Sequence, residues 1–276
     1  DALNGGTQAA GGYDQARYSQ ATSAITATLP GGGAGTVTGD ASVGTDALTG
    51  IEEIYASDYD DTLTGGSGND SFLGMKGADQ ISGGAAGIAG GYDRVSYSIG
   101  TVGAGVTVTM GGAIGAGTAT DQWGNTDTLT SIESVQGSHF ADTLTGNSAN
   151  INTYLRTYQP ETFEGLGGND TINGGTNAPT HFAQVTYASS GAAVTVNLGS
   201  GTASDGFGGT DTLSNIDSVI GSSFNDSLTG GSTSSQIIAT GYFEQFEGGL
   251  GDDTIDGGSG TDRANYSSGG SVTVVL

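Results

Sequence analysis

The stretch FEGLGGNDTINGG, residues 163–175, surrounds one aspartate with glycines and allows a single isoleucine before the glycines return. Related stretches stand at 64–84 (TGGSGNDSFLGMKGADQISGG) and 246–266 (FEGGLGDDTIDGGSGTDRANY). Glycine adopts backbone angles that other residues avoid, so such a run predicts a tight turn. The apolar residue two positions after the aspartate predicts a short strand that follows each turn.

The pattern recurs in five copies, each with two glycines, an aspartate and an apolar residue in fixed order. The copies are Gly65, Gly68, Asp70 and Phe72; Gly74, Gly77, Asp79 and Ile81; Gly165, Gly168, Asp170 and Ile172; Gly248, Gly251, Asp253 and Ile255; and Gly257, Gly260, Asp262 and Ala264. Successive acids such as Asp61, Asp70 and Asp79 are nine residues apart, so turns on the same side recur every eighteen residues. Strands this short bury their apolar side chains only when each coil stacks on the previous one.

Stacking brings the acidic turns of neighbouring coils together. Stacked strands lie ~4.8 Å apart, and bare carboxylates at that distance repel by ~3 kcal/mol at an effective dielectric constant of about 20. Calcium binds about 6–8 oxygen atoms from carboxylates and backbone carbonyls, and glycine lets a tight turn point its carbonyls inward. A single copy favours an Asx-turn without metal, whereas five copies in register favour a ladder of calcium ions that folds only with the cation.

The pattern resembles the RTX, or haemolysin-type, calcium-binding nonapeptide repeat. The resemblance implies a right-handed parallel β-solenoid or β-roll, in which six-residue turns bind several Ca²⁺ ions and the next three residues form a strand. The predicted ligand positions are Asp61, Gly65, Gly68, Asp70, Gly74, Gly77, Asp79, Asp93, Asp142, Glu161, Gly165, Gly168, Asp170, Asp226, Glu244, Gly248, Gly251, Asp253, Gly257, Gly260 and Asp262. Glu161, Glu244 and Ala183 replace an expected aspartate, which weakens the prediction for those turns.

Weaker candidates lie in a different turn, in acidic pairs six residues apart. These pairs are Asp40 and Asp46, Asp121 and Asp127, and Asp205 and Asp211. A calcium site and a metal-free turn both stay open for them. Four tyrosines also recur in register, and we expect an aromatic stack along the coil, with a sugar-binding platform as the alternative: Tyr18, Tyr97, Tyr187 and Tyr266.

A longer repeat organises the whole chain. The blocks at 44–66, 125–147 and 209–231 align without gaps, and their final acids Asp61 and Asp142, then Asp142 and Asp226, are separated by 81 and 84 residues. We expect one continuous array over 1–276, with units at approximately 1–79, 80–170 and 171–253 and a partial unit at 254–276. Both ends fall inside a unit and lack the distinct caps of a solenoid, which predicts a segment of a longer repetitive chain. The inserts at 147–160 and 231–243 are expected to bulge from one side of the coil.

Composition narrows the fold class to all-β. No segment shows a sustained 3.6-residue period of apolar residues, as a helix would. The chain instead contains short strand-like segments separated by glycine-rich turns, and it has 54 glycines in all. An antiparallel sandwich is the alternative, but a nonapeptide rhythm gives strands too short for it. The 29 acidic and 5 basic residues give a formal charge of −24, which disfavours nucleic acid and anionic lipid as partners and attracts cations. No run approaches the ~18 apolar residues of a membrane helix.

Repetition of the acids indicates a structural role, since catalytic sites occur once. Basic residues are few, and no Ser–His–Asp order or histidine cluster emerges, so we expect no enzyme activity. We predict a calcium-stabilised structural or adhesive segment of an extracellular bacterial repeat protein, such as an adhesin stalk, a surface fibre or a layer protomer. The alternative is a non-catalytic RTX secretion module of an exported enzyme. End-to-end self-association is a further expectation, and carbohydrate or O-linked glycan is a conceivable partner.

Overall fold

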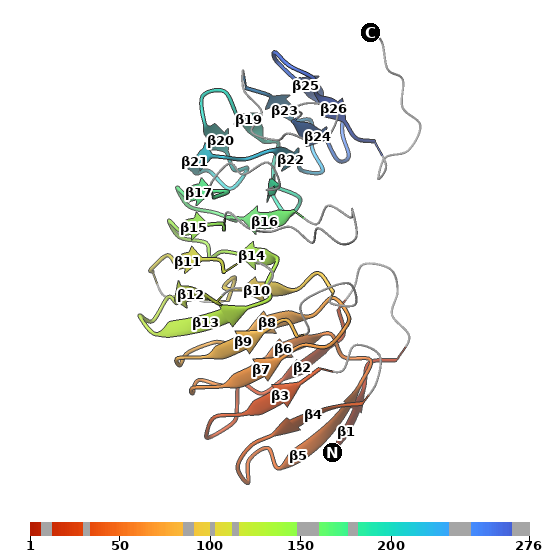
Figure 1. Ribbon diagram of the computed structural model, residues 1–276, viewed down its shortest axis with the longest axis vertical. Helices are drawn as coiled ribbons and strands as arrows, with labels where there is room; N and C mark the ends of the chain where they lie inside the picture. The colour runs from red at the N-terminus through yellow and green to blue at the C-terminus, as the bar shows by residue number, and fades with distance from the viewer. Residues whose placement is uncertain are drawn as a thin grey trace. The chain divides into compact units, whose positions relative to one another are not determined.

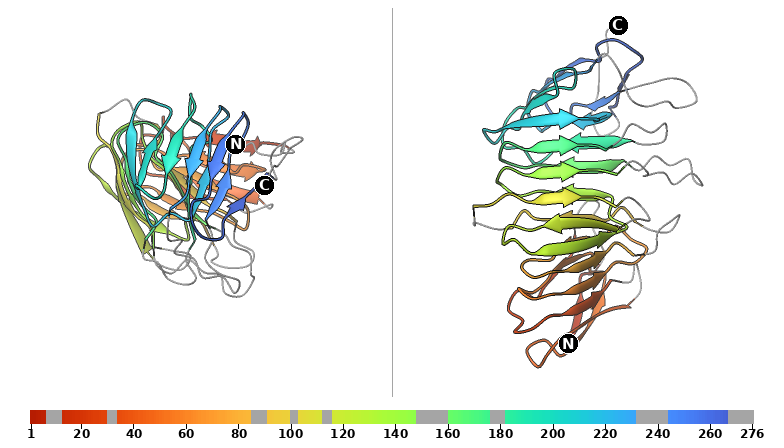
Figure 2. Two further views of the ribbon diagram at one scale, coloured as in Figure 1. Left: turned by 90° about the horizontal axis from the view of Figure 1, so that it is seen from above. Right: turned by 60° about the vertical axis from the view of Figure 1, so that its left-hand side comes forward.

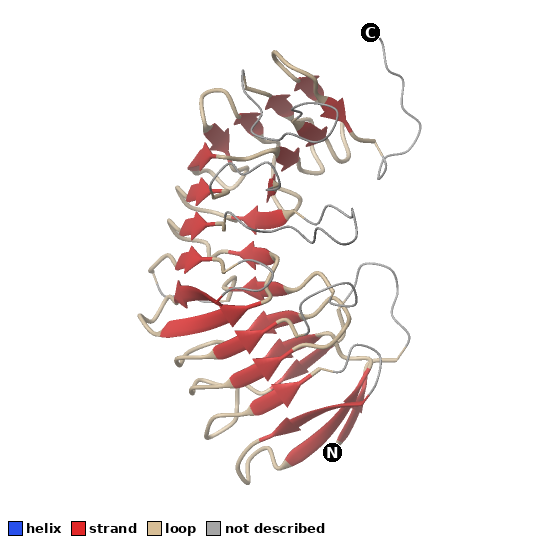
Figure 3. Cartoon of the chain, viewed as in Figure 1, coloured by secondary structure: helices blue, strands red, loops and turns tan. Residues whose placement is uncertain are grey.

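The computed structural model describes residues 1–6, 13–29, 34–84, 91–99, 103–111, 116–147, 160–175, 182–231 and 244–266. These residues form two compact units that divide between Ser138 and His139 (Figure 1). Every regular element among the described residues is a β-strand (Figure 3). The predicted bulges at 147–160 and 231–243 lie almost wholly outside the described residues.

Unit 1 contains two sheets, which we call sheet A and sheet B. Sheet A has the order β1-β5-β4-β3-β7-β9-β13-β12-β11, and sheet B has the order β2-β6-β8-β10-β14. The strands of sheet A are β1 (Ala2–Asn4), β3 (Thr26–Thr28), β4 (Ala34–Thr38), β5 (Thr45–Thr49), β7 (Thr62–Thr64), β9 (Gln80–Ser82), β11 (Thr107–Thr109), β12 (Ala116–Thr120) and β13 (Thr126–Thr130). Those of sheet B are β2 (Gln15–Arg17), β6 (Glu53–Tyr55), β8 (Ser71–Leu73), β10 (Arg94–Ser96) and β14 (Ser134–Gln136).

Unit 2 repeats this arrangement. Its sheet A has the order β15-β17-β21-β20-β19-β23-β25, and its sheet B has the order β16-β18-β22-β24-β26. The strands of sheet A are β15 (Thr143–Thr145), β17 (Thr171–Asn173), β19 (Thr195–Asn197), β20 (Thr202–Ser204), β21 (Thr210–Ser214), β23 (Ser227–Thr229) and β25 (Thr254–Asp256). Those of sheet B are β16 (Glu161–Glu164), β18 (Ala183–Thr186), β22 (Ser218–Ile220), β24 (Gln245–Glu247) and β26 (Arg263–Ala264).

Successive nonapeptides supply strands to opposite sheets, as a β-roll requires. Strand β7 continues through the Asp70 turn into β8 in sheet B, and β9 then returns to sheet A beside β7. Parallel pairing joins these strands to the same sheet of the next coil, and Figure 2 shows the short strands stacked within each unit. The expected parallel β-solenoid is therefore confirmed.

The core between the two sheets consists of apolar ladders. In sheet A of unit 1, Leu63, Ile81 and Leu129 are neighbours in register and at most 1% exposed. In sheet B of unit 2, Phe163 pairs with Val185, and both are fully buried. The apolar residue two positions after the aspartate lies in the core in three of the five nonapeptides, as the pattern predicts for Phe72, Ile81 and Ile172. In the last two nonapeptides the prediction fails, because Ile255 is half-buried and Ala264 is exposed near the end of unit 2.

Sheet A also contains antiparallel strands, which the sequence did not predict. Strand β4 pairs antiparallel with both β3 and β5, and β12 does so with β11 and β13. In unit 2, β20 takes the same place between β19 and β21. The first acid of each pair six residues apart lies in the hairpin turn that follows β4, β12 or β20, and the second acid lies in the next strand, β5, β13 or β21.

We expect Phe163→Ala to lower the free energy of unfolding of the calcium-loaded protein by about 3–5 kcal/mol, because the fully buried ring leaves a cavity. Phe224, in the same unit, is 43% exposed, so Phe224→Ala serves as the control and has a much smaller effect. Denaturant unfolding measures both. Equal losses in the two variants would contradict the assignment of Phe163 to the core.

Candidate calcium-binding turns

The first glycine of each nonapeptide makes room for the carboxylate of its own turn. A Cβ atom on Gly74 would lie 2.2 Å from Oδ2 of Asp79, and one on Gly165 would lie 2.2 Å from Oδ2 of Asp170. Real Cβ atoms do not approach an oxygen this closely. The glycine is therefore required because the aspartate side chain folds back against the turn backbone.

The second glycine lets neighbouring coils approach each other. Gly77 and Gly168 have φ values of 116° and 139°, which L side chains rarely adopt. A Cβ atom on Gly77 would lie 2.4 Å from the carbonyl oxygen of Tyr59, and one on Gly168 would lie 2.6 Å from that of Phe140. Carbonyl oxygens of one coil thus face the acidic turn of the next coil.

The acidic turns on the sheet A side form a column in each unit. In unit 1, the amide of Asp61 donates a hydrogen bond to Oδ1 of Asp79 (2.8 Å), and the amide of Asp79 donates to Oδ1 of Asp127 (3.0 Å). In unit 2, the amide of Asp142 donates to Asp170 (2.8 Å), and that of Asp170 donates to Asp211 (3.1 Å). The structure thereby places Asp127 and Asp211, weaker candidates in the sequence, in line with the nonapeptide acids.

Near the C-terminal end of unit 2 the same contact joins two further predicted residues. The amide of Asp226 donates to Oδ1 of Asp253 at 3.0 Å. Sequential turns nine residues apart do not join each other, because they lie on opposite sides of the coil.

A second column lies on the sheet B side. Here the amide of Asp70 donates to Oδ1 of Asp93 (2.9 Å), and the amide of Glu244 donates to Oδ1 of Asp262 (3.4 Å). Sequence reasoning missed three members of this column, Glu52, Glu133 and Asp217, which accept the amides of Asp14, Asp93 and Ala183. The sequence pattern that could have identified these three residues is an acid directly after isoleucine, which recurs in the segments IEEI, IESV and IDSV.

The Oδ2 atoms of Asp79, of Asp170 and of Asp205 are buried carboxylate oxygens that have no hydrogen-bond partner among the described residues. Each of these residues is at most 1% exposed. A buried, unsatisfied carboxylate is strongly unfavourable unless a cation or a proton compensates it. These oxygens point to the positions where a cation completes the structure.

The family comparison agrees with this geometry. A model of the RTX calcium-binding nonapeptide repeat matches residues 46–86, 160–178, 211–233 and 238–271. The chain carries RTX calcium-binding nonapeptide repeats. A search of curated proteins gave no significant match. No helix suited to crossing a lipid bilayer occurs in the part of the chain that the structure describes.

The RTX matches contain all five nonapeptide copies that the sequence pattern identified. They also contain Asp61, Glu161, Asp226 and Glu244, whereas Asp93, Asp121, Asp127, Asp142 and Asp205 lie outside them. The column contacts of Asp127 and Asp142 therefore extend the acidic ladder beyond the segments that the family model matches.

Side chains alone do not make a metal cage in the described ranges, since no three Asp, Glu, His or Cys side chains are placed to hold one ion. A calcium ion needs about 6–8 oxygen ligands. The RTX turns therefore fit calcium only if carbonyl oxygens supplement one or two carboxylates. The close approach of the Tyr59 and Phe140 carbonyls to the facing turns is consistent with such a ligand set.

Two predicted ligands differ from the glycine-rich turns because a serine satisfies their carboxylates. The amide and hydroxyl of Ser57 both donate to Asp61, at 2.7–2.9 Å. Ser222 makes the equivalent contacts to Asp226, at 2.5 and 2.7 Å. These turns are held together by protein donors, in contrast to the turns of Asp79 and Asp170.

The hairpin acids divide between two roles. Asp205 caps its own turn, because Oδ1 accepts the amides of Phe207, Gly208 and Gly209 at 2.8–2.9 Å. Asp121 accepts amides of its turn in the same way, as an Asx-turn does.

The second acid of each hairpin pair binds a recurring tyrosine. The phenol of Tyr97 donates to Asp127 at 2.9 Å, and that of Tyr187 donates to Asp211 at 3.0 Å. Tyr18 makes the same contact with Asp46. These three tyrosines thus share a hydrogen bond to a buried acid, and this contact, not the aromatic stack that we expected, accounts for their recurrence. The fourth, Tyr266, is 43% exposed.

Burial controls the electrostatics of the sheet A column. Burial, with the neighbouring carboxylates of Asp127 and Asp61, raises the pKa of Asp79 to about 9 against the opposing effect of the Asp61 amide. Burial likewise raises the pKa of Asp170 to about 8 and that of Asp211 to about 6. Without a cation, protons therefore neutralise part of the column near neutral pH.

We expect Gly168→Ala to raise the calcium concentration at the folding midpoint by about tenfold, equivalent to about 1.4 kcal/mol. The added Cβ would collide with the Phe140 carbonyl that faces the turn. The control is Gly208→Ala, because Gly208 also has a positive φ of 108° but its Cβ would meet no atom within 4 Å. Calcium titration monitored by circular dichroism measures both, and equal shifts would contradict the role of the close approach.

The metal-free protein should lose stability as pH rises from about 4 to about 8. A carboxyl whose pKa is higher in the folded than in the unfolded state binds more protons when folded, so its stabilisation is lost above the unfolded pKa. Asp79, with a folded pKa of about 9 against an ordinary 3.8, contributes across this whole window. Melting curves in calcium-free buffers test this, and Asp79→Asn should flatten the slope. A melting temperature that rises over the same window would contradict the proposed burial of these acids.

Proposed function

We propose that the chain is a calcium-stabilised structural or adhesive segment of an extracellular bacterial repeat protein. The observation that carries the proposal is the recurrence, in both units, of a buried aspartate oxygen without a protein donor: Asp79 in unit 1, and Asp170 and Asp205 in unit 2. Calcium supplies the missing positive charge at these positions. The same arrangement repeated along a coil supports a ladder of ions.

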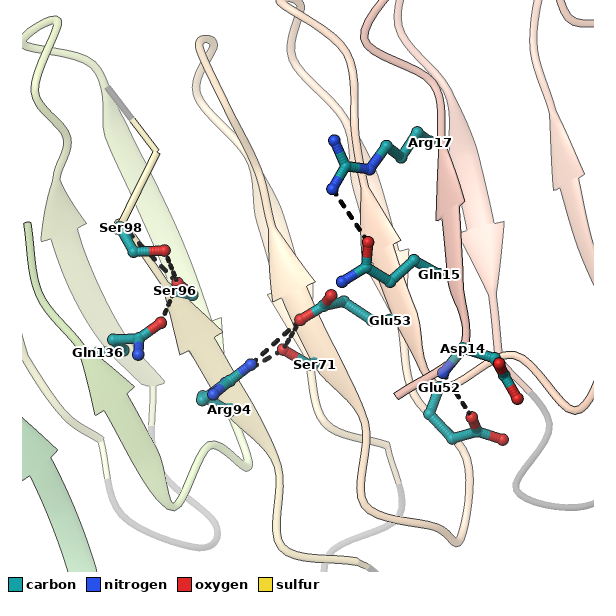
Figure 4. A network of polar contacts seen from close by, with 10 residues as sticks. All are labelled: Asp14, Gln15, Arg17, Glu52, Glu53, Ser71, Arg94, Ser96, Ser98 and Gln136. Atoms are coloured by element: carbon teal, nitrogen blue, oxygen red, sulfur yellow. Dashed lines mark hydrogen bonds and ion pairs between the residues drawn. The ribbon is translucent and has the colours of Figure 1, made fainter. Parts of the chain in front are cut away.

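The distribution of the basic residues supports a structural role. Arg94 forms an ion pair with Glu53 at 3.1 Å and donates to Ser71 at 3.2 Å, on the outer side of sheet B (Figure 4). Arg17 donates to Gln15 and lies over the ring of Tyr55. The contacts of Arg94 with Ser71 and of Arg17 with Tyr55 connect neighbouring strands of sheet B, as expected of residues that stabilise a coil. His181 and Arg156 lie outside the described residues.

An extracellular location is consistent with calcium control of folding. Repeats of this family occur in secreted bacterial proteins. Extracellular calcium modules bind the ion with dissociation constants of about 10⁻⁴–10⁻³ M. A chain that needs such a concentration would acquire its rigidity after export. Carbohydrate binding and end-to-end association stay predictions, and so does the alternative of a secretion module attached to an enzyme.

The test is a calcium titration of the chelated protein, followed by circular dichroism and thermal melting. Calcium at a hundredfold excess over its dissociation constant should add about 2.7 kcal/mol per site to the free energy of unfolding. Magnesium at equal concentration should have a smaller effect, because it requires near-octahedral geometry and retains its waters. Calcium-independent β-structure with an unchanged melting temperature would contradict the proposal.

A pair of variants separates site binding from general charge effects. Asp170→Asn removes a buried column carboxylate and should reduce the number of bound calcium ions measured by calorimetry. Asp252→Asn makes the same change in charge at an exposed position of unit 2 and should leave the number unchanged. Equal effects would mean that calcium merely screens the net charge.

A further inference from the structure

The outward face of sheet A in unit 1 is a regular array of hydroxyl groups. Each strand turns its apolar residue inward and the residues on either side outward, as in Thr26-Ala27-Thr28 of β3, where only Ala27 is buried. Strands β4, β7, β11, β12 and β13 show the same Thr-x-Thr pattern. The pattern is therefore a property of the sheet and does not depend on one strand.

Pairing aligns these residues into rows across the sheet. The longest row runs through eight strands in register: Thr45, Thr38, Thr26, Thr62, Gln80, Thr128, Thr118 and Thr109. A second row, two residues along each strand, contains Thr36, Thr28, Thr64, Ser82 and Thr130. The five strands from β4 to β13 thus present ten aligned positions, nine of which carry a hydroxyl group.

This face is uncharged although the protein has a formal charge of −24. Among the described strands of unit 1, no outward position of sheet A holds an acidic, basic or aromatic side chain. Its strand aspartates, Asp46 and Asp127, point inward and are buried. The outer side of sheet B is different, since it carries Glu53, Arg94 and Arg17 (Figure 4). In the described strands of unit 1, charged side chains thus lie on the outer side of sheet B and not on the outward face of sheet A.

The array has two fixed spacings. Neighbouring strands lie ~4.8 Å apart, and alternate residues of one strand lie ~6.7 Å apart. Threonine is branched at Cβ and stiff at χ1, so its methyl and hydroxyl groups are held in place before any ligand binds. A partner that matches both spacings gains many weak contacts at little cost in side-chain entropy. Such a partner is itself periodic, uncharged and rich in hydrogen-bonding groups.

We propose that this threonine array, formed by the outward residues of β3, β4, β5, β7, β9, β11, β12 and β13, binds the surface of ice. The oxygen atoms of hexagonal ice repeat at distances close to both spacings of the array. Crystalline polysaccharide is also periodic and uncharged, but sugar rings are bound by stacking on aromatic side chains, and this face has none among its described residues. The inference goes beyond the calcium-dependent structural role and does not rest on it.

The test measures the fraction of calcium-loaded protein that enters slowly grown ice, together with inhibition of ice recrystallisation. The full chain should concentrate in the ice. Thr26→Lys and, independently, Thr128→Lys place a charge in the longest row at exposed positions, and each should reduce the ice-bound fraction by about tenfold. Gln15→Lys adds the same charge to the outer side of sheet B and should leave binding unchanged.

Each variant is first shown to have the same melting temperature as the parent protein. Two array variants on different strands are used so that misfolding of one variant does not decide the test. Exclusion of the full chain from ice would overturn the proposal. So would full binding by both array variants, or an equal loss in Gln15→Lys. Retention on insoluble cellulose or chitin in place of ice would assign the face to polysaccharide and also overturn it.

Discussion

The structure depends on the burial of a carboxylate in stacked turns of a narrow coil. The amide of one acidic residue is satisfied by the carboxylate of the next, as Asp61 is by Asp79 and Asp79 is by Asp127. This contact fixes the register between coils, but it places ionisable groups where water is excluded. Burial raises their pKa, so the coil needs either protons or a divalent cation to stay compact.

The turns solve this problem in two ways. In the turns of Asp61 and Asp226 a serine donates through its amide and its hydroxyl, so the protein itself satisfies the carboxylate. In the turns of Asp79 and Asp170 the position of that serine is taken by Met75 and Leu166, which have no hydroxyl group, and one carboxylate oxygen stays unpartnered. Each unit thus combines a turn whose carboxylate is satisfied by protein donors with a turn that leaves one buried carboxylate oxygen for a cation. The outward residues of the strands take no part in these turn contacts, and in unit 1 they form the threonine array.

The sequence predicted much of this architecture, because the nonapeptide links turn, strand and core in one short pattern. The alternation of turns between two sides followed from a spacing of nine residues, and the inward position of Ile81 followed from its distance to Asp79. The antiparallel direction of strand β12 was not predictable, since inward and outward residues alternate along the segment GTAT in the same way whether the strand runs parallel or antiparallel to its neighbours. The contact between Tyr97 and Asp127 joins residues thirty positions apart and depends on how the hairpin folds back. The serine donors were missed because the pattern records glycine and aspartate only.

A crystal structure grown with calcium, with anomalous scattering to locate the ions, tests the central claim most directly. The account predicts an ion beside Oδ2 of Asp79 and beside Oδ2 of Asp170, with carboxylate and backbone carbonyl oxygens at about 2.3–2.6 Å. An ordered structure in which both turns hold no ion at saturating calcium would contradict the account.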